Sequence, residues 1–199
     1  MTSGGEIGSV DASGHLISVT FRILAVLLLV TLNGFFVAAE FALVKVRETQ
    51  LNPLILEGQR RAKVAGYILQ RLDAFLSATQ LGITLASLGL GWIGEPVFTT
   101  LLSPVFGWLS VESEQLRRVL AFVFGFTALI FLHISAGEQA PKWMAIQRPV
   151  QSALWVSYPL LWFYRISYPL VVALNWTSQW LLRQVGLQAG GSEERAQTE

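Results

Sequence analysis

The chain has 199 residues, of which 53% are hydrophobic and 14% are charged, with a formal net charge of +1 and a mean hydropathy of +0.52. Soluble domains carry about 25% charged residues, so this composition indicates a membrane protein surrounded by a lipid bilayer. The near-zero net charge and the lack of a long basic run give no sign of nucleic-acid binding, and the lack of cysteine excludes disulfides and thiolate metal sites within the chain.

Three apolar segments are each long enough to cross a bilayer as a helix, which takes about 20 residues. The first covers 23–44 and contains Glu40 as its only charge, whereas the second, 74–94, and the third, 119–137, contain none. We therefore expect an all-α membrane protein with three transmembrane helices.

Two glutamates are the most informative charges in these segments. Glu40 lies inside the first segment, and Glu138 directly follows the third. An ionisable side chain at the centre of a membrane helix costs about 3 kcal/mol or more, so such residues usually mark an ion path or a proton relay. The alternative is that both carboxylates reach the lipid headgroups, because a basic residue follows each within four or five positions.

Polar or small positions recur along the second segment at intervals of three or four residues, which places them on one face of a helix. The set comprises Ser77, Gln80, Thr84, Ser87 and Gly91. A neighbouring face carries small residues that let another helix approach closely, namely Ala78, Gly82, Ala86 and Gly89. We interpret the first set as a shared polar surface with Thr84 and Ser87 as candidate ligands. The alternative is that each hydroxyl bonds only to the carbonyl one turn earlier.

The first segment adds two polar side chains. Asn33 and Glu40 are seven residues apart and hence share one face of the first helix. Asn33 fits two roles equally well, that of a ligand and that of an interhelical hydrogen bond worth about 1 kcal/mol or less in a membrane. The carboxylate of Glu40 needs a cation, a set of donors or a proton.

A helix distortion is predicted at the end of the third segment. Pro141 lacks an N–H and clashes with the carbonyl of Gly137, so we expect the helix to break or distort over 137–141 and to free carbonyl groups beside Glu138. His133 is unaccompanied and is expected to be a hydrogen-bonded structural residue. The candidate ligands are then all oxygen atoms, which hard cations such as Mg²⁺, Na⁺ and Ca²⁺ prefer.

The connecting segments predict the orientation of the chain. Six basic residues separate the first two spans: Lys45, Arg47, Arg60, Arg61, Lys63 and Arg71. The positive-inside rule therefore places 45–72 and the C-terminal part in the cytoplasm, with 1–19 outside. The segment 95–117 is expected to be a short outer connection. The aromatic-rich stretch 149–185 is expected to form two or more helices along the cytoplasmic face; the alternative is a kinked fourth span, which would place the C-terminus outside.

Three runs resemble the transmembrane domain of the CorC/CNNM family. They are LNGFFVAAEFALVKVRETQL (32–51), QLGITLASLGLGWIGEP (80–96) and HISAGEQAPKWMAIQ (133–147). The resemblance implies a domain over 20–186 in the plasma (inner) membrane, with three spans, a belt of juxtamembrane helices and a homodimer. It implies Mg²⁺ transport, exchanged against Na⁺, with a dehydrated ion between the spans. It also implies that 187–199 is a linker to a cytoplasmic CBS-domain pair that binds ATP and is absent from this chain.

The resemblance carries over to individual residues only in part. Glu138 matches the acidic ligand of the family's Gly-Glu-x-x-Pro-Lys turn, while Thr84 and Ser87 stand where many members have Asn. Many members also have a Ser near the first-span glutamate, where this chain has 37–39 (Val-Ala-Ala). These departures bear on the identity of the ion more than on the fold. The resulting candidate ligands are Glu138, Ser87, Thr84, Glu40, Gly137 and Asn33.

Two functions are consistent with these features. The first is transport of Mg²⁺ or another divalent cation, most readily as Na⁺-coupled export. The alternative is an ion-sensing membrane scaffold that acts through partner proteins without transport of its own. An enzyme is not expected, because the chain contains no HExxH motif, no clearly spaced Ser/His pairing and no nucleotide-binding loop.

Overall fold

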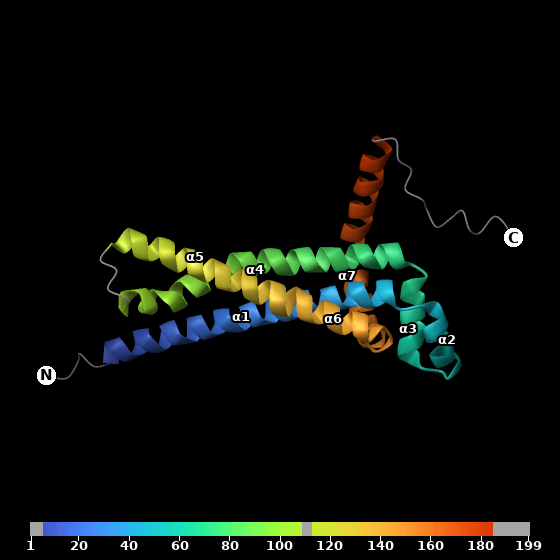
Figure 1. Cartoon of the computed structure of the whole chain (residues 1–199), viewed down its shortest axis with the longest axis horizontal. Coiled ribbons are helices and arrows are strands. Elements are labelled where there is room, and N and C mark those ends of the chain that lie inside the picture. Colours follow the sequence, from blue (N-terminus) through green and yellow to red (C-terminus); the bar gives the residue numbers. More distant parts are fainter. Residues whose placement is uncertain (1–5, 109–112, 185–199) are drawn as a thin grey trace.

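The computed structural model describes residues 6–108 and 113–184, and every regular element within them is a helix. Three long helices lie side by side along the molecule: α1 (Glu6–Lys45), α4 (Leu72–Trp108) and α5 (Glu114–Leu132) (Figure 1). A π-helical turn, η1 (His133–Gln139), joins α5 to α6 (Ala140–Gln147) without a break. The predicted all-α fold is confirmed.

Three helical stretches are long and apolar enough to cross a membrane: Ser18–Lys45, Leu72–Gly94 and Phe122–Gln147. The chain is therefore a multi-pass membrane protein, as its composition predicted. The third stretch runs ten residues beyond the predicted end at 137, so Glu138 lies within it. The outer connection expected over 95–117 is largely helical, because α4 continues to Trp108; residues 109–112 lie outside the described part.

The helix does not break at Pro141, contrary to one of the two predicted outcomes; it distorts. The Ala140 N–H donates to the carbonyl of Ser135, five residues earlier, which is the hydrogen-bond pattern of a π-helix. Pro141 then falls in the first turn of α6, where a residue needs no N–H donor. The π-helical turn therefore compensates for the N–H donor that Pro141 lacks, and the chain stays helical through the distortion.

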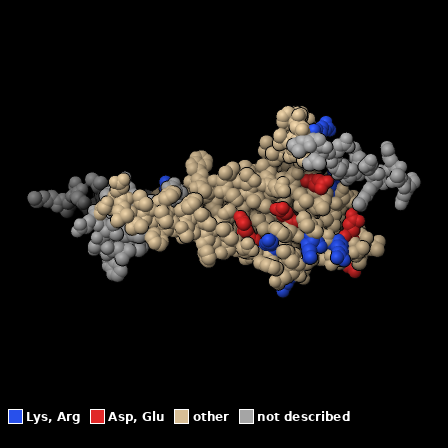
Figure 2. All heavy atoms as spheres, turned by 45° about the horizontal axis from the view of Figure 1, so that its top comes forward, with Lys and Arg blue, Asp and Glu red and all other residues tan. Residues whose placement is uncertain are grey.

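The basic connector contains two short helices, α2 (Glu48–Leu56) and α3 (Arg60–Leu69). Gly58 has a φ of 83°, a left-handed conformation that glycine adopts without a steric cost, and it lets the chain reverse between the two helices. On the face drawn in Figure 2, most charged side chains lie toward this end of the molecule, while most of the elongated body is free of charge. Such a division is typical of a domain whose body lies in lipid.

The aromatic-rich C-terminal stretch forms one helix, α7 (Pro149–Gln184), instead of the two or more that we expected. A proline inside a helix costs about 3 kcal/mol, and α7 contains Pro159 and Pro169. Packing of buried Val156, Leu160 and Val171 on this helix offsets that cost. α7 crosses α1 and α4 steeply (Figure 1) and is not one of the candidate spans, which goes against the fourth-span alternative. The linker predicted over 187–199 lies outside the described residues.

The small-residue face of α4 packs against α1, as its spacing predicted. Ala78, Gly82 and Ala86 are buried. A Cβ atom placed on Gly82 would lie 2.6 Å from ring atoms of Phe36 on α1, so only glycine allows this approach. Phe36 in turn packs on Phe163 of α7, with 4.6 Å between the ring centroids. These contacts fix the separation of α1 and α4 at the height where the polar side chains meet.

Candidate cation site at the π-helical turn

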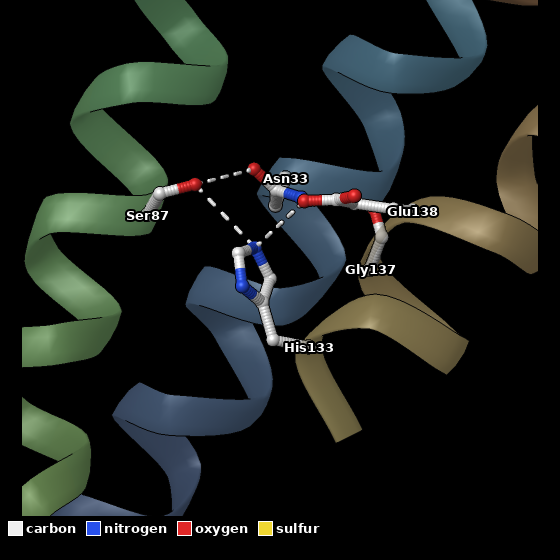
Figure 3. Close-up of polar contacts among 5 residues, drawn as sticks. All are labelled: Asn33, Ser87, His133, Gly137 and Glu138. Carbon is white, nitrogen blue, oxygen red and sulfur yellow. Dashed lines mark hydrogen bonds and ion pairs between the residues drawn. The ribbon is translucent and has the colours of Figure 1, made fainter. Parts of the chain in front are cut away.

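Polar groups from three helices converge at η1 (Figure 3). Asn33 of α1 is fully buried, and its Nδ2 donates to the carbonyl oxygen of Gly137 at 2.9 Å. Ser87 of α4 donates its hydroxyl to Asn33 Oδ1 at 3.2 Å. The bond to Gly137 fixes the orientation of the amide, so that Asn33 Oδ1 faces Ser87 and the interior of the group.

The side chains of His133 and Glu138 complete this group. His133 Nε2 lies 3.4 Å from Ser87 Oγ and 3.7 Å from Glu138 Oε1. The Glu138 side chain is 42% exposed, against 20% for His133. In Figure 3 dashed lines join this ring nitrogen to oxygen atoms of Ser87 and Glu138, and a further line joins Ser87 to Asn33. The carboxylate is therefore the part of the group most accessible from outside.

The π-helical turn is what brings His133 and Glu138 together. In an α-helix, residues five apart are separated by about 140° around the axis. In a π-helix, hydrogen bonds join residues five apart, so that such residues stack on one face. His133 and Glu138 are the first and sixth residues of η1. The sequence analysis treated His133 as a structural residue because it is unaccompanied by other histidines; Pro141, which predicts a distortion here, is the signal that could have placed it beside Glu138.

Two glycines, one in η1 and one in α1, let neighbouring helices approach each other closely at the site. A Cβ atom on Gly137 would lie 3.1 Å from His133 Cδ2 and 3.3 Å from Asn33 Nδ2, both of which would have to give way. A Cβ on Gly34 would lie 2.9 Å from Pro141 Cγ. Lys142, which ends the Gly-Glu-x-x-Pro-Lys turn, places its Nζ 4.9 Å from the centre of the Phe41 ring and so ties α6 to α1.

Two predicted ligands are not brought to this group. Thr84 is exposed, and its hydroxyl donates to the carbonyl of Gln80 at 2.8 Å, which is the back-bonded alternative. Glu40 is half-buried and lies about 10 Å from Asn33 along α1, at 1.5 Å per residue. The site in this structure therefore comprises Asn33, Ser87, Gly137 and Glu138 of the predicted set, with His133 added.

The polar stripe predicted on the second span does not form one surface. Ser77 donates to Asn175 Oδ1 of α7 at 2.6 Å, Thr84 faces outward, and Ser87 faces α1. Thr84 and Ser87 differ by about 60° around the helix axis. That angle is wide enough for neighbouring helices to cover one of these residues and leave the other exposed.

The composition of the site suits a cation. Among the side chains that the structure describes, no three His, Asp or Glu residues gather closely enough to hold a metal by themselves. The group at η1 is of a different composition: it joins one carboxylate with an amide oxygen, a hydroxyl, a backbone carbonyl and an imidazole. Oxygen-rich donor sets of this kind match hard divalent cations.

Comparison with known proteins agrees with this architecture. The profile of the Cyclin M transmembrane N-terminal domain matches residues 23–199. The chain belongs to the CNNM family. The resemblance to the CorC/CNNM transmembrane domain is thereby confirmed.

Bacterial relatives cover most of this CNNM domain. UPF0053 protein YugS of Bacillus subtilis is 42% identical over 168 residues, which are 84% of this chain and 39% of that protein. UPF0053 protein YrkA of the same organism is 41% identical over 180 residues, 90% of this chain and 41% of that protein. An uncharacterized protein of Mycobacterium tuberculosis is 35% identical over 167 residues, 83% of this chain and 47% of that protein. The chain thus spans about two fifths of the length of the Bacillus relatives.

Proposed function

We propose that this CNNM domain transports a divalent cation, foremost Mg²⁺, across the membrane, and that the ion binds at the π-helical turn. The observation that carries the proposal is the convergence of Asn33, Ser87 and Glu138 from three different helices on one point within the candidate spans. Polar and ionisable side chains at this depth are costly, and they usually line a substrate or ion path.

The chemistry of the donors supports Mg²⁺ as the substrate. Glu138 supplies a negative charge, and the oxygens of Asn33, Ser87 and Gly137 supply neutral ligands. Mg²⁺ takes oxygen ligands at about 2.0–2.1 Å, usually through one or two carboxylates, and keeps several waters. The partial exposure of Glu138 gives a hydrated ion its first contact. The backbone and amide oxygens then replace part of its water shell.

The finer features of transport follow the family resemblance. We propose Na⁺-coupled export from the cytoplasm, with the domain acting as a homodimer in the plasma membrane. The basic residues of α3, together with Arg47 and Arg71 beside the two connector helices, support a cytoplasmic position for that end, with the N-terminus outside. ATP would act only through a CBS-domain pair outside this chain. Glu40 lies on the same helix as Asn33, toward the end that carries the basic connector, where it would attract cations before they reach the site.

The proposal is tested by Mg²⁺ flux in proteoliposomes. Glu138→Gln keeps the shape of the side chain and removes its charge, so we expect flux to fall to the level of empty liposomes. Glu57→Gln, on the exposed connector, is the matched control and is expected to leave flux unchanged. Undiminished flux in Glu138→Gln would refute the proposal. Saturable Mg²⁺ binding without flux in the unmodified protein would favour the ion-sensing scaffold instead.

A further inference from the structure

We infer that the protein binds an anionic phospholipid beside the cation site, with the phosphate at Arg148 and one acyl chain in a groove between α1 and the continuous segment of η1 and α6. The lipid belongs to the leaflet at the end of the molecule that carries the basic connector. This inference does not rest on the proposed function, because the proposed ion ligands line neither the groove nor its mouth.

The groove runs along α1 and has a volume of about 350 Å³. Its lining positions on α1 recur at helical spacing from Leu27 to Ala38, and the opposite wall comes from α5, η1 and α6: Leu132, Ala136, Pro141 and Met144. Leu27 and Ala38 lie about 16 Å apart along the helix axis, at about 1.5 Å per residue. This length is close to half of a hydrocarbon core about 30 Å thick, which is the depth that one acyl chain fills.

The lining of the groove suits a hydrocarbon chain. Small residues from both walls, including Gly34 and Ala136, leave the space open. Thr31 contributes a hydroxyl, but that hydroxyl donates to the carbonyl of Leu27 at 2.8 Å and offers no free donor to the groove. An empty groove loses dispersion contacts, and in a bilayer the molecule that restores them is a lipid chain.

A second pocket, of about 390 Å³, adjoins the groove and forms its mouth. Met144 and Trp155 line both cavities, and the mouth adds Arg148, Gln151 and Ser152. Arg148 directly follows the third candidate span, which ends at residue 147, so its guanidinium lies at the depth of the lipid headgroups. The side chain of Trp155 is 56% exposed, and tryptophan favours the boundary between headgroups and hydrocarbon.

The charge at the mouth complements a phosphate. Arg148 is exposed, and among the side chains that the structure describes no carboxylate pairs with it. A guanidinium presents its N–H donors in a planar arrangement that matches phosphate oxygens. α7 begins at Pro149, so the positive end of its dipole adds to the charge of Arg148. Basic pockets between helices on the cytoplasmic side of a membrane are typical binding sites for anionic headgroups.

A second copy of the chain fits this face less well. A symmetric dimer places the same patch of both copies against each other. Dimerisation through the groove would therefore bring two Arg148 side chains to the same level of the membrane, and like charges at an interface are unfavourable. A phospholipid supplies both the negative charge and the apolar chain that the two cavities require.

The test uses photolabelling of the full chain in phosphatidylcholine nanodiscs. These contain a trace of phosphatidylglycerol that carries a diazirine on one acyl chain, and labelled peptides are identified by mass spectrometry. A phosphatidylcholine probe with the same chains is the neutral control. We expect the anionic probe to label the groove segments 27–38 and 132–144 severalfold more than the neutral probe does.

Two pairs of variants assign the headgroup and the chain. Arg148→Gln should lower labelling of the groove by the anionic probe about fivefold, because one basic residue near the membrane surface contributes about 1 kcal/mol. Arg165→Gln, also exposed on α7, is the matched control and should leave it unchanged. Thr31→Phe fills the groove and should block labelling, whereas Leu28→Phe, exposed on α1 outside the groove, should not.

Equal labelling of the groove by the two probes in the unmodified protein would overturn the inference, even if a variant fails to fold. Undiminished labelling in a folded Arg148→Gln variant would also overturn it. So would a photoactivatable amino acid at position 31 that cross-links a second copy and no lipid, because the groove would then be a dimer interface. Each of these outcomes leaves the proposed function standing, since Mg²⁺ flux and its loss in Glu138→Gln are measured separately.

Discussion

Two neighbouring layers of the three-helix body are held together in different ways. Before α1 reaches Asn33, its contacts with the other helices are apolar: Val26 and Val30 pack with Leu90 and Leu129. One turn further along α1, Asn33 replaces this packing with hydrogen bonds to both neighbouring helices. The helix geometry changes at the same height, from α to π. The buried amide of Asn33 thus has a partner for both its nitrogen and its oxygen, and the apolar layer beside it holds the helices in position.

Among variants that keep Glu138, replacement of Asn33 should change this contrast with the largest effect. Asn33→Leu removes an amide oxygen from the site and the donor to the Gly137 carbonyl. We expect Mg²⁺ affinity to fall by about 10–100-fold, measured by calorimetry. Stability in detergent should fall by only about 1 kcal/mol, since a membrane hydrogen bond contributes little more. Val30→Ile in the apolar layer should leave Mg²⁺ binding intact. A comparable loss of Mg²⁺ affinity in that variant would show that Asn33 acts through packing alone.

A second variant tests the close packing of α4 on α1. Gly82→Ala places a Cβ 2.6 Å from ring atoms of Phe36, whereas Gly91→Ala on the same helix meets open space. Overpacking costs about 1–3 kcal/mol, so Gly82→Ala should lower thermal stability in detergent. Gly91→Ala should not. Equal stability of the two variants would contradict the close approach of α1 and α4.

The smallest expected effect concerns two hydroxyls of one helix. Ser87 faces the site, while Thr84 is exposed and bonds to its own helix. We expect Ser87→Ala to lower Mg²⁺ affinity severalfold and Thr84→Val to leave it unchanged. A larger effect of Thr84→Val than of Ser87→Ala in the same calorimetric titration would mean that the polar stripe acts as one surface after all.

The sequence predicts the helices better than it predicts their local geometry. Length and apolarity identify the three spans, and small residues on one face predict the packing of α4 on α1. The resemblance of the motif around Gly137 and Glu138 to the family's turn predicts two residues of the candidate site, and the polar positions of the first two spans add Asn33 and Ser87. The spans and their packing depend on composition and on α-helical periodicity, both of which can be seen in a single chain.

The remaining features depend on contacts that no periodicity encodes. The break or distortion predicted over 137–141 takes the form of a π-helical turn, because a shift in hydrogen-bond pattern satisfies the backbone at a lower cost. That shift adds His133 to the site. Thr84 turns outward because neighbouring helices cover only one side of the stripe. α7 stays continuous through two prolines because its packing outweighs their cost.

The most direct test of the central claim compares the two glutamates of the spans. Mg²⁺ is titrated calorimetrically into the unmodified protein, Glu138→Gln and Glu40→Gln in nanodiscs. We predict that Glu138→Gln abolishes saturable binding, while Glu40→Gln, about 10 Å from Asn33 along α1, keeps an affinity within a fewfold of the unmodified protein. Binding that survives in Glu138→Gln and is lost in Glu40→Gln would place the ion away from the π-helical turn and contradict this account.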